Sequence, residues 1–490
     1  MSLLTFLQED TPRTLFPLEG PRLVIERGAS EISNFVDQEI FSTAEVHPHF
    51  AQAPIAFALK GPLETRRVHV LDPIATFYLY GFVYQHTGCF RQPTKSLPKR
   101  RYGYHFKDKL PVNAAEEHQR FRSRIIDLKQ NHKYIGKVDI ANCFSAFYHH
   151  DVVSVLKAYV GEEKARRFGV FLREINAGRS VSCFPQGYFP TKAIGNLYLS
   201  FVEENADLRS PAIVRYLDDI YLFADSRRRI EADIYRIQTM LSAHNLYLNA
   251  SKTIVETSKS SMRLPRTNAI RKSLLAKRAE AIETAYDERP EDVHLTDDEF
   301  GYLSSVISAK DVAEEDVELA LALITEDEAH AERLAELVFR RYPHLIKSLY
   351  THLSSAAFDG PTLFKLIEHA VADRSAHEFV LFWCARILLA MYKWNRAIAQ
   401  LIMTIHNHVN ASNVVKALIL ESAHLDFGMA DQKENALQNA GSSIVAVAAA
   451  VGLRDLEHGK RNQLYKYAAA SSPLMYQVTS ALQKAAPTGP

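Results

Sequence analysis

The sequence has few cysteines, no long apolar run and almost no net charge, and each of these absences excludes a class of protein. Four cysteines in 490 residues form neither a zinc-binding spacing nor a disulfide framework, so we expect a protein of a reducing cytoplasm. No apolar run has the length of a transmembrane helix, so no membrane contact is expected. Because Glu9 and Asp10 follow a very short apolar start, we expect no signal peptide. The cysteines are Cys89, Cys143, Cys183 and Cys384.

The charge balance and composition describe a folded chain of more than one domain. A formal net charge of +1 excludes a globally basic nucleic-acid coat and leaves any nucleic-acid contact to local patches. With 47% hydrophobic and 23% charged residues, the chain can bury two or three cores. The composition changes near residue 265, beyond which Ala, Leu, Glu and Lys dominate. We therefore predict an α+β domain over residues 1–265 and an all-α domain over residues 266–490.

Two adjacent carboxylates, Asp218 and Asp219, interrupt an apolar, β-prone run. Strand interiors exclude Asp, and burying a bare carboxylate is costly. A hairpin explains the pair, with residues 213–217 as the first strand and 220–223 as the second. Such a turn would present both acids at one point, which suits a divalent metal. An ordinary Asp-Asp turn is the alternative.

Three further signals surround this pair. Residues 134–140 form an expected strand that carries Asp139 near its end, and a helix is expected over 151–159. Pro185-Gln186-Gly187 precedes an expected helix over 192–205, and Lys252 follows the hairpin and a further helix. Four signals in this order over about 120 residues are far more specific than any one of them.

That order resembles the palm of reverse transcriptases over roughly residues 70–260. Asp139 matches motif A, Pro185-Gln186-Gly187 matches motif B, and Tyr216-Leu217-Asp218-Asp219 matches the Tyr-x-Asp-Asp box. Lys252 matches the lysine of motif D. The resemblance implies a fingers and palm fold and two-metal nucleotidyl transfer with dNTPs. It further implies Mg²⁺, or Mn²⁺ in its place, held by Asp139, Ile140, Asp218 and Asp219, with Lys252 facing the triphosphate. A solvated turn lysine is the alternative for Lys252.

Motif A and motif B also supply candidates for sugar recognition. Phe144 occupies the position where the family places an aromatic residue under the sugar, and a ring there would exclude a ribose 2′-hydroxyl. The alternative is a core Phe at the start of a helix. Gln186 would lie against the sugar and base, and Gly187 would permit close backbone approach. The family's Ser-Pro after motif B is replaced by Tyr188-Phe189-Pro190-Thr191-Lys192, with Thr191 as an expected N-cap. We interpret this change as altering the surface near a template base.

A basic segment with interleaved aromatic residues lies upstream, over residues 91–109. Its Lys99, Arg100 and Arg101 are candidates to contact a triphosphate or a nucleic-acid backbone. A solvated charged face is the alternative.

The second half of the chain has the periodicity of short helices joined by short loops. Stacked helix pairs of this kind predict a helical-repeat (HEAT-like) α-solenoid or a related bundle. Trp383 and Trp394 are either aromatic anchors for a partner or ordinary core residues, and helix spacing favours the core. Helices are expected over residues 272–286, 296–309, 312–323, 329–342, 345–356, 362–372, 376–392, 395–407 and 412–422.

A reverse-transcriptase palm joined to a long helical half resembles the bacterial abortive-infection reverse transcriptases, the P2-prophage type most of all. The resemblance implies anti-phage defence in the bacterial cytoplasm and DNA synthesis without a template. It also implies priming from a protein hydroxyl, a single-stranded DNA product attached to the polypeptide, a homo-oligomer, and a phage component as a partner. Two alternatives stay open: an RNA-templated reverse transcriptase, and a non-catalytic interaction protein with a polymerase-like fold.

Overall fold

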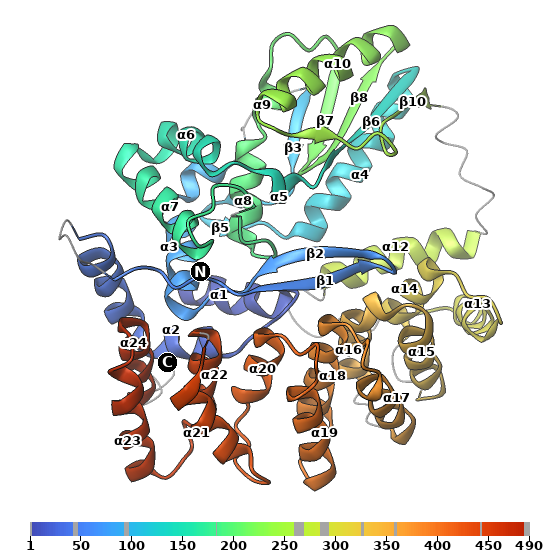
Figure 1. Ribbon diagram of the computed structural model, residues 1–490. Helices are drawn as coiled ribbons and strands as arrows, with labels where there is room; N and C mark the ends of the chain where they lie inside the picture. The colour runs from blue at the N-terminus through green and yellow to red at the C-terminus, as the bar shows by residue number, and fades with distance from the viewer. Residues whose placement is uncertain are drawn as a thin grey trace. The chain divides into compact units, whose positions relative to one another are not determined.

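The chain folds into two compact units (Figure 1). The sheet unit comprises Met1–Phe6 and Leu79–Thr267, and the helical unit comprises Leu7–Tyr78 and Asn268–Pro490. Some predictions concern positions outside the described residues, namely Cys183, Tyr286 and residues 259–265 and 485–490. No helix in the described part of the chain is both long and apolar enough to cross a membrane. The computed structural model describes residues 2–42, 48–92, 98–182, 184–258, 269–284, 294–324, 328–356, 360–441 and 443–484.

A six-stranded sheet forms the centre of the sheet unit, in the order β10-β6-β8-β7-β3 with β9 paired to β6. The β3–β7 pair is parallel, and the other pairs are antiparallel. A separate hairpin pairs β4 with β5. The strands are β3 (Lys99–Tyr102), β4 (Phe106–Lys107), β5 (Leu110–Pro111), β6 (Tyr134–Ala141), β7 (Ala212–Tyr216), β8 (Asp219–Ala224), β9 (Tyr247–Leu248) and β10 (Ile254–Thr257).

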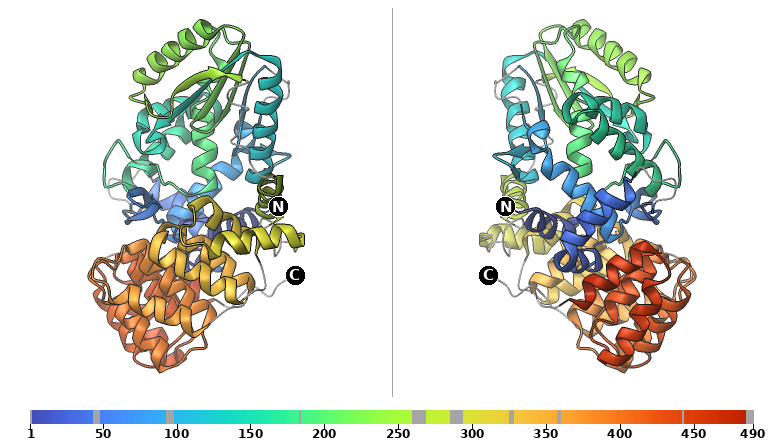
Figure 2. Two further views of the ribbon diagram at one scale, coloured as in Figure 1. Left: turned by 90° about the vertical axis from the view of Figure 1, so that its right-hand side faces the viewer. Right: turned by 90° about the vertical axis from the view of Figure 1, so that its left-hand side faces the viewer.

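Helices cover both faces of this sheet, and Figure 2 shows α4 and α10 on opposite sides of it. Ile135 of β6 packs with Phe121 and Leu128 of α4 in a buried cluster. The next residue, Gly136, faces α10, because a Cβ there would lie 2.5 Å from Ile230. Alternation along β6 therefore places Asp139 on the same face as Ile135. The helices are α4 (Ala114–Asn131), α5 (Cys143–Ala146), α6 (His149–Val160), α7 (Glu162–Ile175), α8 (Phe189–Tyr198), α9 (Phe201–Glu204) and α10 (Arg227–Ala243).

The helical unit has two rows of helices. Even-numbered helices from α12 to α24 contact one another in succession, and among the odd-numbered helices α13 to α19 do the same and α21 contacts α23 (Figure 1). The helices are α12 (Ala269–Thr284), α13 (Asp297–Ser308), α14 (Glu314–Leu323), α15 (Glu328–Arg341), α16 (Ile346–Ala356), α17 (Pro361–Ala372), α18 (Glu378–Met391), α19 (Arg396–His406), α20 (Asn413–Leu420), α21 (Met429–Asn439), α22 (Ser443–Gly452), α23 (His458–Ala469) and α24 (Pro473–Gln483).

Residues 7–78, which the sequence placed in the first domain, cluster instead with these helices. Phe16 packs edge to face on Phe379 and Phe382 of α18, with ring centroids 5.6 and 5.1 Å away. Buried Glu421 accepts hydrogen bonds from the backbone N–H groups of Glu19 and Gly20 at the start of α2. Because these contacts join residues that are hundreds of positions apart in the sequence, no pattern within a short segment predicts them. The elements of this segment are α1 (Leu3–Asp10), α2 (Gly20–Asn34), β1 (Ile55–Gly61), β2 (Glu64–His69) and the beginning of α3 (Pro73–Gln85).

Most predicted helices correspond to observed ones with small shifts at their ends, but the helix predicted over 192–205 is two helices in the structure, α8 and α9, separated by Leu199 and Ser200. Thr296 and Asn395 cap α13 and α19 through their side chains, as residues of these types commonly do. The N-cap prediction for Thr191 was wrong. Helix α8 begins two residues earlier, at Phe189, with Pro190 in its first turn, and Thr191 is buried inside the helix. Trp383 is 1% exposed and lies in the core of the helical unit, as helix spacing favoured.

Candidate active site

The predicted hairpin is present and holds the Asp pair at its turn. Strands β7 and β8 are joined through Leu217 and Asp218, and Tyr216 pairs with Asp219. Leu217 has φ 52°, a left-handed conformation that is uncommon for a residue with a branched side chain. The backbone N–H of Ile140 in β6 donates to the Asp218 carbonyl at 3.3 Å. The turn is therefore fastened to the strand that carries Asp139.

The residues that carry the three carboxylates of motifs A and C lie at the same end of β6 and β8. Asp139 and Asp219 are paired directly across these strands. Burial raises the pKa of Asp219 above its ordinary value, and the negative charge of Asp139 adds to this rise. Burial also raises the pKa of the Cys143 thiol, and the charges of Asp218 and Asp139 raise it further. Asp139 acts on both Asp219 and Cys143, and Asp218 acts on Cys143, so the site concentrates negative charge that a cation would relieve.

Lys252 contacts this group directly, through Asp139. Its Nζ lies 3.3 Å from Asp139 Oδ1, and the lysine side chain is half exposed. The Asn249 backbone N–H donates to the Asp139 carbonyl at 2.8 Å, and the Lys252 N–H donates to the Asn249 carbonyl at 3.1 Å. The loop of motif D is thus anchored to the backbone of motif A. These contacts favour a site residue over a solvated turn lysine.

The residues present fit a hard divalent cation in their chemistry. Carboxylates and a backbone carbonyl are the oxygen ligands that Mg²⁺ prefers. The like-charge contribution to the pKa of Asp219 is the repulsion that such an ion would remove. Among the described residues, no group of three or more His, Cys, Asp or Glu side chains is already gathered at metal-binding geometry. Binding would therefore compete with Lys252 for the Asp139 carboxylate and draw the acids together.

The candidates for sugar recognition lie where motif A meets motif B. The half-buried Phe144 ring lies 5.2 Å from the Phe147 ring, and a Cβ on Gly195 of α8 would approach Phe144 to 2.6 Å. Gln186 Nε2 donates to Ser145 Oγ at 2.8 Å, which joins the motif B loop to α5. Gly187 has φ 109°, a conformation that requires glycine. The structure therefore brings Phe144 and Gln186 together through α5.

The basic candidates of the upstream segment lie on β3, at the edge of the sheet beyond β7, and have partners there. Lys99 Nζ donates to two backbone carbonyls of the loop after α9, each at 2.9 Å. Arg100 donates to Gln92 Oε1 at 2.6 Å. Arg101 is 8% exposed and forms an ion pair with Glu204 at 3.3 Å. All three cations thus have partners within the sheet unit, and their contact with a triphosphate or a nucleic-acid backbone stays a prediction.

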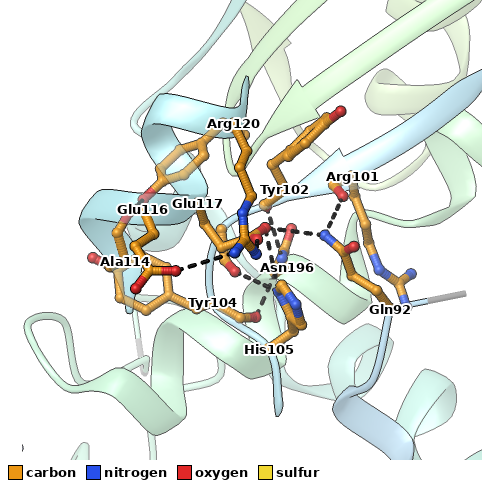
Figure 3. Close-up of polar contacts among 12 residues, drawn as sticks. Gln92, Arg101, Tyr102, Tyr104, His105, Ala114, Glu116, Glu117, Arg120 and Asn196 are labelled. Carbon is orange, nitrogen blue, oxygen red and sulfur yellow. Dashed lines mark hydrogen bonds and ion pairs between the residues drawn. The ribbon is translucent and has the colours of Figure 1, made fainter. Parts of the chain in front are cut away.

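A polar network beside β3 explains why this segment is held in place (Figure 3). Gln92 Nε2 donates to the Arg101 carbonyl at 2.8 Å and to Glu117 Oε2 at 3.1 Å. Glu117 is 1% exposed and also accepts from Arg120 at 2.9 Å. Asn196 of α8 donates to the carbonyls of Tyr102 and Tyr104. The basic segment is therefore bonded to α8, the helix that follows motif B, and helps to hold that helix in place.

Two residues near the acids, Lys137 and His118, were missed by the sequence reasoning, as was Arg122 beside His118. Lys137 shares a face of β6 with Asp139, and its charge lowers the pKa of Asp219. Its Nζ lies 5.8 Å from the centre of the Tyr221 ring. His118 and Arg122 project from α4, and the pKa of His118 is lowered mainly by burial and then by Arg122. Lys137 could have been found from the sequence, because residues two positions apart on a strand lie on the same face.

Comparison with known proteins identifies the class of this domain. Residues 92–304 match the family model described as reverse transcriptase (RNA-dependent DNA polymerase). The matched segment contains Asp139, Gln186, Asp218 and Lys252 in the predicted order. This part of the chain, residues 92–304, is therefore similar in sequence to reverse transcriptases. No curated protein matched the sequence.

Two solved structures with detectable similarity are telomerases. Apo telomerase from Candida tropicalis is 11% identical with a TM-score of 0.33, and the alignment covers 78% of this chain and 69% of that one. Telomerase from Candida albicans in complex with a fragment of telomeric RNA is 10% identical with a TM-score of 0.31, over 78% of this chain and 65% of that one. At these values no property of either telomerase is transferred to this chain.

Proposed function

We propose that the chain is a DNA polymerase that adds deoxynucleotides to a growing 3′-hydroxyl. The observation that carries this proposal is the convergence of Asp139 and the Asp218–Asp219 turn beside Lys252, inside a reverse-transcriptase domain. Asp139 and Asp218 would hold Mg²⁺, with the Ile140 carbonyl and Asp219 as further oxygen donors. The bound ions would supply a more nucleophilic hydroxyl and neutralise the triphosphate. Lys252 would approach the triphosphate as a cation or proton donor.

The finer proposal is template-independent, protein-primed synthesis in anti-phage defence. Its support is the family resemblance of the layout, a reverse-transcriptase domain together with a long helical region of repeat-like stacking. The change after motif B does not add to this support, because Tyr188 and Phe189 are 8% and 6% exposed. Both rings are buried, so of this change only Lys192 is left as a residue that could alter the surface near a template base, and that interpretation stays a prediction. A homo-oligomer and a phage component stay predictions.

The tyrosines of the helical unit differ in their capacity to act as a primer. The hydroxyls of Tyr342, Tyr392 and Tyr465 donate to backbone carbonyls. Tyr467 of α23 and Tyr476 of α24 are 59% and 57% exposed. An exposed hydroxyl can enter a catalytic site, whereas a buried one cannot without local unfolding. We therefore propose Tyr467 and Tyr476 as the first candidates for a priming residue.

Replacing the true priming tyrosine by phenylalanine is expected to remove covalent protein–DNA product, because only its hydroxyl oxygen can be esterified. The measurement is incubation with Mg²⁺ and labelled dNTPs, followed by phenol extraction before and after protease digestion. Tyr467→Phe and Tyr476→Phe are tested singly and together. Tyr465→Phe is the matched control, since it removes a neighbouring hydroxyl that is already buried.

The same assay separates the alternatives. Labelled DNA that partitions free of protein, and that forms only when RNA is added, would favour an RNA-templated reverse transcriptase. No incorporation with or without RNA would favour a non-catalytic interaction protein. Covalent product retained in the double Tyr467→Phe/Tyr476→Phe variant would remove both residues as primers.

Phe144→Ala is expected to raise the use of ribonucleotides relative to deoxynucleotides, because it opens space for a 2′-hydroxyl. A rise of roughly 10- to 100-fold in the ratio of incorporation rates is expected. Gly195→Ala tests the same contact from the other side, since its Cβ would displace the Phe144 ring. Phe57→Ala, which truncates an exposed ring in β1, is the control. An unchanged ratio in Phe144→Ala would make Phe144 a packing residue only.

A further inference from the structure

Arg215 is a fully buried cation beside the motif C turn, and it makes more hydrogen bonds than packing alone would require. It lies on β7, immediately before the Tyr216-Leu217-Asp218-Asp219 box, and is 0% exposed. Its Nε and Nη2 donate to the two carboxylate oxygens of Glu203, at 2.7 and 2.8 Å. Nη1 donates to Asn196 Oδ1 at 3.1 Å, and Nη2 donates to the Asn196 carbonyl at 2.9 Å. Nη1 also donates to the Leu217 carbonyl at 2.9 Å.

These acceptors belong to three different elements. Glu203 is on α9, Asn196 is on α8 after motif B, and Leu217 is the first residue of the motif C turn. Asn196 continues the network, because its Nδ2 donates to the carbonyls of Tyr102, at the end of β3, and of Tyr104 (Figure 3). One guanidinium therefore connects the turn that carries Asp218 to the helix of motif B.

Stability alone does not account for this arrangement. Burying a charge pair carries a desolvation penalty that can equal or exceed the attraction, and apolar replacements of similar volume are often at least as stable. What the pair provides is a fixed planar fork of donors. One of these donors holds the carbonyl of Leu217, whose left-handed φ of 52° persists only where its surroundings enforce it.

We propose that Arg215 is a positioning residue: by holding the Leu217 carbonyl against Asn196 and Glu203, it fixes the direction in which the Asp218 carboxylate leaves the turn. The proposal rests on the polymerase function proposed above, because it concerns the same carboxylate. Arg215 touches no substrate. It acts indirectly: Arg215 orients the Asp218 carboxylate, and that carboxylate sets the affinity and position of the divalent cation.

The test replaces the charge pair as a unit. The Arg215→Met/Glu203→Leu double variant removes both charges, so neither is left buried and unpaired. Arg215→Lys keeps a charge opposite Glu203, but one ammonium cannot span Glu203, Asn196 and the Leu217 carbonyl. Asp233→Asn is the matched control. Asp233 is another fully buried carboxylate of the sheet unit, and it accepts from the backbone of Arg209 and Ser210, away from the turn.

Three readouts are made on the full chain: thermal unfolding, Mn²⁺ binding followed by electron paramagnetic resonance, and steady-state incorporation of a dNTP. We expect the double variant to unfold cooperatively near the wild-type temperature and to bind Mn²⁺ about 10- to 100-fold more weakly. Its kcat should fall about 100-fold with little change in KM, because a small displacement of the carboxylate harms the reaction more than nucleotide binding. Arg215→Lys should lower kcat in the same direction, and Asp233→Asn should lower only the unfolding temperature.

The outcomes separate the positioning role from the proposed function. Wild-type Mn²⁺ affinity and kcat in a folded double variant would overturn the positioning role. A kcat loss that merely parallels a loss of folded protein, in the double variant and in Asp233→Asn alike, would overturn it too. If the wild-type chain incorporates no nucleotide but the double variant still loses Mn²⁺ affinity, the polymerase proposal fails and the positioning role stands.

Discussion

Asp139→Asn and Asp218→Asn are each expected to abolish nucleotide incorporation while the fold is retained. Each substitution removes one negative charge from a site built to hold two divalent ions. Losing one such electrostatic contact costs on the order of 3 kcal/mol in the transition state, or at least about 100-fold in rate. The measurement is incorporation of labelled dNTPs with Mg²⁺, with chelation of the metal as a parallel test on the wild-type chain.

Asp225→Asn is the control for these variants. Asp225 follows β8 at the opposite end from Asp219 and accepts from the Lys133 backbone N–H at 3.0 Å. Its loss should leave incorporation unchanged. Undiminished incorporation in both Asp139→Asn and Asp218→Asn would sink the assignment of these carboxylates, and with it the polymerase proposal.

Gly452→Ala is expected to have the largest effect on stability, and it acts in the helical unit. A Cβ at this position, at the end of α22, would lie 1.9 Å from the carbonyl oxygen of Leu420 in α20. Because that atom belongs to the backbone, α20 and α22 must move apart. The Nζ of buried Lys433, which donates to the carbonyls of Ser422 and His424, would be disturbed as well. Overpacking of this severity costs on the order of 3 kcal/mol.

Thermal unfolding followed by circular dichroism measures this cost. Gly301→Ala is the matched control, since Gly301 lies within α13 and a Cβ there meets nothing within 4 Å. That control should raise stability by up to about 1 kcal/mol, because alanine is the better helix former. Equal unfolding temperatures for Gly452→Ala and the wild type would contradict the close approach of α20 and α22.

Local patterns accounted for the elements that carry the candidate site. Two acids inside a β-prone run can be tolerated only at a turn, and the structure has that turn between β7 and β8. The sequence placed Asp139 near the end of the β6 strand, and alternation along that strand would also have revealed Lys137, whereas the pairing of Asp139 with Asp219 is a register that the structure supplies. Periodicity and capping residues similarly located the helices from α13 to α20, because these signals lie within a few residues of one another.

Local patterns failed wherever the partner is distant in the sequence. From the sequence, the basic residues Lys99, Arg100 and Arg101 are predicted to form a phosphate-binding patch. In the structure, Lys99 and Arg101 have partners more than a hundred residues away, in the loop after α9 and on α9, whereas Arg100 contacts the nearby Gln92. Thr191 read as a cap because its side-chain type suits one, but the buried aromatic residues before it start α8 earlier.

The sequence by itself determined the identity and order of the chemical groups: Asp139, Gln186, the Asp218–Asp219 turn and Lys252, on elements whose type is set by local hydrophobic periodicity. Only the tertiary structure decided which charged residues form ion pairs or hydrogen bonds within the protein. It also decided that residues 7–78 pack with the helices and that Arg215 holds the motif C turn. The physical reason is that burial and long-range hydrogen bonding depend on which segments meet, and the periodicity of one segment does not specify its partner.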